Sequence, residues 1–412
     1  MKTLDQLDGK LDAVNARADT IEAKAEKRTP ISSLPFVINQ SGSYYFTQNL
    51  HFTAASGNAI TVSAVNVTID LMGFTLSSGA EVTGDGIQIN SNARRCTVRN
   101  GNITGTTTVT ISGSGASRVW TVNAGGFARG VLAPAITDSC RYVELTVTRC
   151  RTVGMSGGEG STAERCIARE NGTIGIEAEV ITASHSSFNG TAGIANVSGI
   201  SNVSTITGSV AHSNGRDGIL GSIIDATVVD CTASRNGRGG IVGATVTSCT
   251  AVNNGGTGIE AQAVFQSVAR SNEADGIAAP SVRHCRATFN RLHGISVTTN
   301  LLAGVVASVS ENESGHNGNG GLGAGIYFER DGVRVEGNNC HNNDWGIQSA
   351  AGADGVVVRN SCRGNSTAPI NAGASGNYDF DRSTNTYGPV ITVDGDMTGT
   401  AGASHPWVNI QY

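Results

Sequence analysis

The sequence has few aromatic residues, few prolines, few charges and no long apolar run. Of its 412 residues 5% are aromatic and 15% charged, and 7 prolines accompany 55 glycines. Glycine at about twice its usual share of roughly 7%, without matching proline, excludes collagen, and the dispersed valine, isoleucine and alanine argue against disorder. Because no run of about 18 apolar residues is present, the sequence predicts no membrane span.

Charge is nearly balanced, with 28 Lys plus Arg against 33 Asp plus Glu and a formal net charge of -5. This balance predicts no nucleic-acid partner. All four lysines precede residue 28, so arginine or histidine carries every later positive charge. The break in composition predicts an N-terminal segment of residues 1–28 that is separate from the rest of the chain. A repeat described below predicts a main domain of residues 29–370, and its loss predicts a capping segment of residues 371–412.

Nine cysteines show no CxxC or CxxH spacing, and their number is odd. Both facts argue against a disulfide framework and against a zinc site. We predict that the cysteines are reduced, buried and inert, because several of them recur at one position of that repeat.

An apolar seam runs through the N-terminal segment at alternating steps of four and three residues. It consists of Leu4, Leu7, Leu11, Val14, Ala18, Ile21 and Ala25. Leucine at a with valine or isoleucine at d favours three parallel strands. We therefore predict a homotrimer through residues 4–25, with a single helix folded back on the next domain as the alternative. The sequence leaves open whether this helix is native or engineered.

A repeat begins at residue 166 and recurs seven times as Cys or Ser, four residues, Asn, three residues and Gly-Ile. Examples are CIARENGTIGI from Cys166 and CTAVNNGGTGI from Cys249. The repeated asparagines are Asn171, Asn189, Asn214, Asn236, Asn254, Asn272 and Asn290. Spacings of 18 to 25 residues are typical of a solenoid of short strands.

Each part of this repeat has a physical reason. Alternate residues of the Cys-x-Ala-x stretch point inward, where small side chains suit a narrow interior. A buried asparagine at a fixed corner can bond the coils above and below, which predicts an internal amide ladder. Glycine before isoleucine is expected to permit a tight bend or a positive φ. The predicted fold is all-β, a right-handed parallel β-helix, because varied periods and asparagine corners disfavour the left-handed hexapeptide form.

The chain resembles a family of bacterial secreted right-handed parallel β-helix repeat proteins, abundant in planctomycetes and mostly of unassigned function. The resemblance covers nearly the whole chain. It depends on MKTLDQ at the start, RTPISSLPFVINQSGSYYFTQNL, VTIDLMGFTL, the Asn and Gly-Ile coils, and the closing GPVITV and HPWVNIQY. MKTLDQ and RTPI lie almost adjacent in that family, so the seam here resembles an insertion between them. The resemblance implies an extracellular or cell-surface protein whose export signal is absent from this chain.

The repeat is lost after residue 370, where aromatic residues gather. They are Tyr378, Phe380, Tyr387, Trp407 and Tyr412. An open coil exposes unpaired backbone edges, so we expect this segment to cap the last coil. A sugar-stacking platform is the alternative.

The coils that begin at Cys166, Ser184 and Ser209 hold the first candidate site. Arg169, His185 and His212 are expected on one outward face of successive coils. Glu177 and Glu179 are expected to point outward together, about 7 Å apart. Beside a loop of residues 196–202 these groups could act as acid, base and Ca²⁺ ligands, and solvated surface residues are the alternative.

The second candidate site lies in the long spacing between Ile295 and Ile326, which contains ENESGHNGNGGLGAG. Glu311, Glu313, His316 and Asp331 could meet there around Ca²⁺. A simple loop excursion is the alternative.

Enzymes of this fold class make demands that the sequence does not meet. It has no adjacent Asp-Asp pair of the kind a pectinase-type hydrolase uses, and no lysine after residue 27 to act as a lyase base. We therefore predict a non-catalytic exported rod that is structural, adhesive or glycan-binding, with Ca²⁺ as the one cofactor left open. The alternatives are a polysaccharide lyase or hydrolase acting on a lateral face, and a tailspike-like component of a phage or injection particle.

Overall fold

The structure is a computed structural model. It describes residues 9–15, 17, 28–113, 117–134, 139–195, 204–298, 307–318, 322–365, 376–379, 384–392 and 400–411. Residues 9–15 and 17 are helical, with Leu11 and Val14 exposed. The other five seam residues lie outside the described part of the chain, so the coiled coil and the trimer stay predictions. No helix in the described part is long and apolar enough to cross a membrane.

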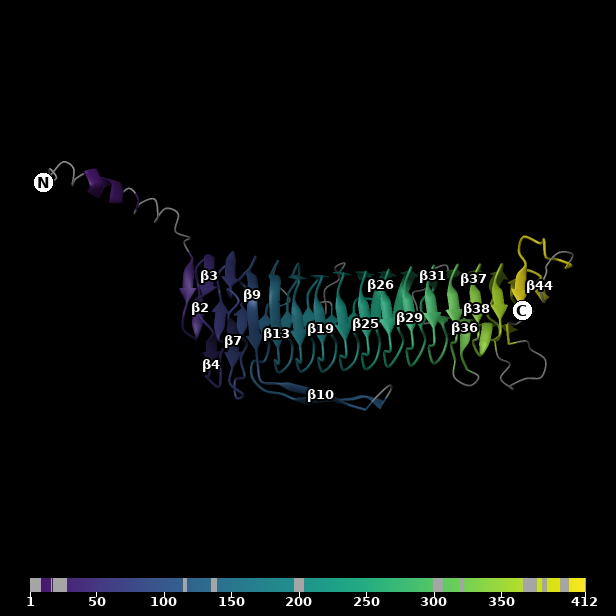
Figure 1. Cartoon of the computed structure of the whole chain (residues 1–412), viewed down its shortest axis with the longest axis horizontal. Helices are drawn as coiled ribbons and strands as arrows, with labels where there is room; N and C mark the ends of the chain where they lie inside the picture. The colour runs from purple at the N-terminus through teal and green to yellow at the C-terminus, as the bar shows by residue number, and fades with distance from the viewer. Residues whose placement is uncertain are drawn as a thin grey trace.

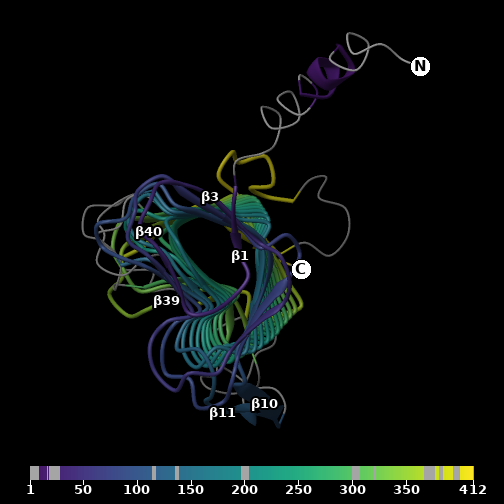
Figure 2. The same cartoon turned by 90° about the vertical axis from the view of Figure 1, so that its left-hand side faces the viewer.

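From residue 29 the chain forms a parallel β-solenoid of about 15 coils, and a complete coil gives one strand to each of three faces (Figures 1 and 2). The first face carries the Gly-Ile strands. Its strands are β2 (Phe36–Ile38), β5 (Ile60–Val62), β8 (Ile87–Ile89), β12 (Val131–Leu132), β14 (Met155–Ser156), β17 (Ile176–Glu177), β20 (Ile194–Ala195), β23 (Ile219–Leu220), β30 (Ile277–Ala278), β33 (Ile295–Val297), β36 (Ala324–Phe328), β39 (Trp345–Ser349) and β42 (Tyr378–Asp379).

The second face follows the first in each coil. Its strands are β1 (Thr29–Ile31), β3 (Gly42–Phe46), β6 (Val67–Asp70), β15 (Thr162–Glu164), β18 (Val180–Thr182), β21 (Thr205–Thr207), β24 (Thr227–Val229), β31 (Ser281–Arg283), β34 (Ser308–Ser310), β37 (Val333–Glu336), β40 (Gly355–Val358) and β43 (Thr386–Tyr387). Two long strands, β26 (Ile241–Thr247) and β28 (Ile259–Phe265), turn the corner from the first face into the second.

The third face ends at the asparagine corner. Its strands are β4 (Leu50–Phe52), β7 (Thr75–Ser78), β16 (Ile167–Arg169), β19 (His185–Ser187), β22 (Val210–His212), β25 (Thr232–Ser234), β27 (Thr250–Val252), β29 (Val268–Arg270), β32 (Arg286–Thr288), β35 (Glu313–Gly315), β38 (Asn339–His341), β41 (Ser361–Arg363), β44 (Val390–Thr392) and β45 (Asn409–Gln411). Two long strands, β9 (Thr97–Thr104) and β13 (Arg141–Thr148), belong to both the second and the third face.

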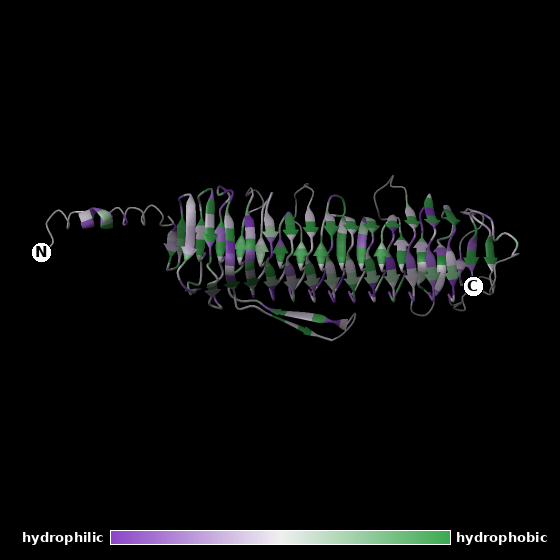
Figure 3. Cartoon of the chain, turned by 45° about the horizontal axis from the view of Figure 1, so that its top comes forward, coloured by the Kyte–Doolittle hydropathy of each residue, from purple (hydrophilic) through white to green (hydrophobic). Residues whose placement is uncertain are grey.

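Identical residues stack in register along the axis. Ile176 pairs with Ile194, Ile194 with Ile219 and Ile219 with Ile241, and these isoleucines are fully or almost fully buried. Hydrophobic and hydrophilic residues alternate along the strands (Figure 3). The interior is therefore a narrow column of isoleucine, valine and alanine, as the period-2 pattern predicts.

From Asn171 to Asn343, the corner between the third and first faces buries one asparagine in each coil. Asn254 donates from Nδ2 to Oδ1 of Asn272 at 3.0 Å and to the carbonyl of Ala233 at 3.1 Å. Its own Oδ1 accepts from the backbone N–H and the Nδ2 of Asn236. The same amide contacts link the seven predicted asparagines and continue through Asn317, Asn343 and Asn365.

The residue before each of these asparagines has left-handed backbone geometry. Glu170, Phe188, Arg235 and Phe289 have φ between 55° and 58° although none of them is glycine. Such a conformation costs roughly 1–2 kcal/mol in a residue with a Cβ. The buried amide bonds of the next residue offset that cost, and the turn makes the preceding side chain stand out from the corner.

Cysteine and serine occupy the corner between the second and third faces. The N–H of Ser209 donates to Sγ of Cys231 at 3.4 Å, and the Cys231 thiol donates to the carbonyl of Val229 at 3.1 Å. Toward the C-terminus a second amide ladder takes over this corner through Asn312, Asn338 and Asn360. These cysteines are therefore hydrogen-bonding corner residues, whereas the sequence pattern suggested simple core filler. All nine cysteines are buried and free of disulfides.

The glycines before isoleucine are explained by close approach and not by a positive φ. None of them is among the glycines with positive φ. A Cβ on Gly276 would lie 2.5 Å from Nδ2 of Asn290 and 2.6 Å from the carbonyl oxygen of Gly294. The expectation of a positive φ is wrong, because the ladder amide of the next coil occupies the space a side chain would need.

Two segments depart from the coil pattern. Among the described residues after 375, β42 pairs with β39, β43 with β40 and β45 with β41, and β45 lies between β41 and β44, which precedes it in the chain. An antiparallel hairpin of β10 (Thr108–Ser112) and β11 (Val119–Asn123) leaves the solenoid and lies along its side (Figure 1).

Candidate functional site

The third face brings together three residues that the sequence predicted on one surface. The guanidinium of Arg169 lies over the ring of Phe188, 5.0 Å from its centroid. The ring of His212 meets Phe188 edge-on at 5.2 Å and His185 edge-on at 5.0 Å. We call Arg169, Phe188, His185 and His212 the first stack. Phe188 contacts both Arg169 and His212, because the left-handed backbone at the corner turns its ring outward. The sequence motif did not identify this residue.

A second stack of the same residue types lies further along the same face. The guanidinium of Arg270 lies over Phe289 at 5.3 Å, and the ring of His316 stacks in parallel on Phe289 at 4.7 Å. The ring of His341 meets His316 edge-on at 5.4 Å. We call Arg270, Phe289, His316 and His341 the second stack.

Strand register shows that the Arg–Phe pairs of the two stacks occupy equivalent positions displaced along the axis, whereas their histidines come from different positions. Arg169 and Arg270 share one column of paired residues, five steps apart through Ser187, His212, Ser234 and Val252. The column position corresponding to His212 is Gly315 in the second stack, where a side chain would collide with the ring of His341. An imidazole from the next coil thus takes the place of the missing side chain.

Positive charge dominates the outward positions of this face. In the part of the face that the structure describes, six arginines lie there against two glutamates: Arg149, Arg169, Arg235, Arg270, Arg286 and Arg363 against Glu170 and Glu313. Glu170 pairs with Arg149 and Arg169, and Glu313 pairs with Arg286 and His341. Burial lowers the pKa of His185 and His212, and nearby Arg169 lowers both further. At neutral pH the arginines therefore carry the positive charge around His185 and His212.

The hairpin borders the first stack. Nε1 of Trp120 donates to the carbonyl of Ser213 at 3.2 Å, and Arg118 donates to the carbonyl of Arg235 at 2.8 Å. A Cβ on Gly237 would lie 2.8 Å from the Trp120 ring, so glycine after the corner asparagine permits the hairpin's close approach. The hairpin forms a fixed wall beside the first stack.

A hollow of about 490 Å³ borders the second stack at the corresponding corner. Phe289 and His316 line it together with Glu273 and Arg291. Phe289 is 50% exposed, so its ring edge is open to a ligand. The second stack is thus the more accessible of the two.

The predicted carboxylates of the first site lie elsewhere. Glu177 is on β17 of the first face, where it accepts from the Ser156 hydroxyl at 2.9 Å. Glu179 lies at the next corner and accepts from the backbone N–H of Gly160. Both glutamates are half-buried on either side of the buried Ala178, as the alternation predicts, but they lie on the first face and at the corner after it, whereas the histidines lie on the third face. The 196–202 loop lies outside the described residues.

The second predicted site is also dispersed. Glu311 pairs with Arg283 and His284 at the corner before β35, and Arg283 holds the pKa of Glu311 below its usual range. Asp331 accepts from the N–H of Asp354 in a turn, while Glu313 and His316 belong to the third face. Among the described residues no group of three or more His, Cys, Asp or Glu is placed to hold a metal ion.

An acid–base group that the sequence did not suggest lies on the first face. Nδ1 of His293 accepts from the N–H of Ala324 at 3.0 Å, and its ring stacks on Tyr327 at 4.4 Å. Asp275 accepts from the backbone N–H of His293. Burial lowers the pKa of His293 and raises that of Asp275. No spacing motif marks this group, because three different coils supply its members.

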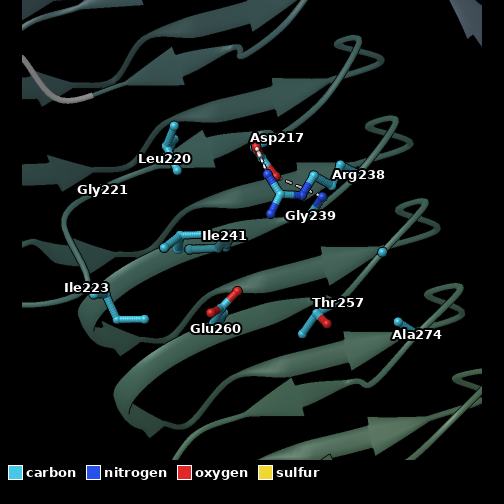
Figure 4. Close-up of a pocket in the computed structure, with 12 residues that line it drawn as sticks. Asp217, Leu220, Gly221, Ile223, Arg238, Gly239, Ile241, Thr257, Glu260 and Ala274 are labelled. Atoms are coloured by element: carbon cyan, nitrogen blue, oxygen red, sulfur yellow. Dashed lines mark hydrogen bonds and ion pairs between the residues drawn. The ribbon is translucent and has the colours of Figure 1, made fainter. Parts of the chain in front are cut away.

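Two further hollows hold polar groups. One of about 480 Å³ on the first face contains Asp217, Arg238 and Glu260 (Figure 4), and Asp217 is already bonded to Gly239 and Arg238. Another of about 350 Å³ at the C-terminal end is lined by Tyr387 and Trp407. Tyr378, by contrast, is buried and bonds the carbonyls of Asn360 and Ile410, as a capping residue would.

Comparisons with known proteins give distant likenesses. No protein-family model matches the chain, and no curated protein matches it. Among solved structures, the A-module of the mannuronan C-5 epimerase AlgE6 of Azotobacter vinelandii is 15% identical with a TM-score of 0.38, over 85% of this chain and 91% of that one. A mutant of the periplasmic alginate epimerase AlgG is 12% identical with a TM-score of 0.42, over 81% and 77% of the two chains.

A tailspike mutant of Escherichia coli bacteriophage HK620, in complex with a pentasaccharide, is 12% identical with a TM-score of 0.32, over 97% and 74%. At such values these likenesses carry no argument about function, and the parallel β-helix is established by the strand register itself.

Proposed function

We propose that the protein binds acidic polysaccharide along its third face and that the two stacks are the binding groups. The observation that carries this proposal is the recurrence of an arginine held over an outward phenylalanine and followed by two histidine rings. Arginine binds carboxylates through two parallel hydrogen bonds, and an aromatic ring beneath it fixes the guanidinium and limits its loss of freedom on binding.

The packing of the coil does not require these residues. Arg169 and Arg270 are exposed, and Ser234 and Val252 replace them at equivalent positions of the same column. The excess of arginine over glutamate on this face is independent support, because an anionic polymer would meet a surface of opposite charge.

The experiment is isothermal titration of the full chain with polygalacturonate and with alginate. We expect binding that weakens with added salt. The double variant Arg169→Gln/Arg270→Gln should bind about 100-fold or more weakly, because it loses two charged hydrogen bonds worth roughly 1.5–3 kcal/mol each. A neutral dextran should not bind.

The matched control is Arg141→Gln, which removes an equally exposed arginine from the second face. Its affinity should equal that of the wild type. Equal affinity of the double variant and the wild type, or no binding to either polyuronate, contradicts the proposal.

Cleavage of the bound polymer is the second candidate function, and the Asp275, His293 and Tyr327 group favours it. A half-buried histidine with a fixed ring and a carboxylate nearby is a common general acid or base. The test is the release of reducing ends or unsaturated products from both polyuronates, with and without Ca²⁺. Products that vanish in His293→Gln and persist in His212→Ala would establish this candidate, whereas binding alone predicts no products from any variant.

A further inference from the structure

We infer that the two stacks are separate subsites of one bivalent site, and that the ligand is an extended anionic polymer long enough to reach both. This inference depends on the proposed function and adds two properties, a minimum ligand length and a direction. Both follow from the geometry of the repeat.

The distance between subsites is fixed by the solenoid. Five strand pairings separate Arg169 from Arg270, and the same number of coils separates Phe188 from Phe289. At about 4.8 Å per coil the subsites lie about 24 Å apart. Each coil is hydrogen-bonded to the next, so the distance between the two subsites is fixed. The distance between two sites carried on loops could change.

The surface between the subsites is small and smooth. Thr232, Ser234, Thr250 and Val252 face outward on the two central coils, and all are half-buried in the flat sheet. Arg235 at the corner is the charged residue of this interval, and the hairpin binds its carbonyl. Apart from Arg235 at the corner, a chain that continues along the axis from one stack to the other meets only small outward side chains of these two strands.

The order of groups gives the site a direction. In each stack the arginine comes first, the phenylalanine one coil later and a histidine in the coil after that. A translation along the axis relates the two Arg–Phe pairs, and no two-fold rotation does. A polysaccharide repeats in the same way, with every unit pointing in one direction, whereas a symmetric ligand would match only one stack at a time.

Occupying both subsites makes the second contact intramolecular. Linked contacts of this kind raise affinity by about 100-fold or more once the ligand spans the sites, without any new type of contact. A ligand shorter than the span gains only the few-fold statistical factor of having more units to bind. Affinity should therefore rise in a step with length.

The experiment measures the affinity of the full chain for size-fractionated oligogalacturonates with extended lengths below and above about 24 Å. For the wild type we expect a step of about 100-fold or more between the two groups. Arg169→Gln and Arg270→Gln should each abolish the step and leave the affinity for short oligomers within a few-fold of the wild type. Arg141→Gln should keep the step.

A smooth rise with length in the wild type, or a step that survives both single variants, overturns the inference. In either case the oligomers still bind, so the proposed function stands. Absence of binding at every length instead rejects the proposed function, so the two failures are distinguishable. Both arginines are exposed, and a melt that matches the wild type verifies that the variants fold.

Discussion

Buried asparagine amides hold the corner between the third and first faces. The side chain of Asn254, for example, makes four hydrogen bonds, and all of them reach other coils. An amide has two donors and one oxygen with two acceptor positions, so Asn254 is fully satisfied. Few other side chains offer this pattern in so small a volume, which explains why asparagine recurs at the corner.

Replacing Asn254 by alanine should lower the free energy of unfolding by about 1–3 kcal/mol, because the Asn236 N–H and the Ala233 carbonyl lose buried partners. Asn272→Ala should behave alike. Thermal or urea melts measure the effect. Asn339, exposed on β38, is the matched control, and its alanine variant should be near neutral. If both ladder variants unfold with the same free energy as the wild type, the ladder does not stabilise the solenoid.

Cysteine at the second corner acts through its hydrogen bonds. Cys231→Ser should cost little stability, because serine already occupies the same corner at Ser184 and Ser209 and accepts the same backbone N–H. Cys231→Val, of similar size without a donor or acceptor, should cost about 1–3 kcal/mol by orphaning the Ser209 N–H. Melts of the two variants provide the comparison, and a valine variant as stable as the serine variant would contradict this role.

Histidines of the first stack should make stability and binding respond to pH in opposite directions. The pKa values of His185 and His212 lie below the ordinary value of 6.5. As pH falls through 6.5 toward these lower values the unfolded chain takes up protons first, so stability is lost in that window and is complete above it. Binding of a polyanion favours the protonated rings, so affinity rises there.

Melts and titrations at about pH 7.5 and about pH 5.5 measure both trends. The variant His185→Gln/His212→Gln should show smaller changes in each. Equal pH responses of the variant and the wild type would show that other groups titrate.

Some strands of the solenoid could be predicted from the sequence, and others could not. The strands between residues 166 and 297 carry a regular motif, so their faces and the seven ladder asparagines could be placed from spacing alone. Asn317, Asn343 and Asn365 continue the same ladder. The spacing motif did not identify them, because insertions before them change the period of the repeat. The Thr and Val alternation of β10 and β11 equals that of a coil strand, so no local signal separated the hairpin from the solenoid.

The candidate site was predictable only where its residues lie within a regular strand of the repeat. Arg169, His185 and His212 follow from the period-2 rule within strands. The same rule places Glu177 and Glu179 outward on either side of the buried Ala178, but it does not separate the first face, where Glu177 lies, from the third face with the histidines. The outward rings of Phe188 and Phe289 depend on left-handed corner residues that propensity does not predict, since phenylalanine seldom adopts that conformation.

The whole molecule is a rod, and its oligomeric state is a prediction from the pattern of the N-terminal segment. The heptad pattern predicts a parallel trimer, and an avid, three-fold presentation of the third face would follow from it. Deleting residues 1–28 should yield a folded monomer by light scattering, because β1 begins at Thr29 and the solenoid has its own core. An oligomer that persists after the deletion would place the interface on the solenoid.

The most direct test of the central claim is a crystal structure of the full chain with a bound oligogalacturonate longer than about 24 Å. The account predicts sugar density along the third face, with carboxylates at the guanidinium groups of Arg169 and Arg270 and the chain crossing Ser234 and Val252. Density confined to the first face around Asp275 and His293, or to the hollow beside Trp407, would contradict it.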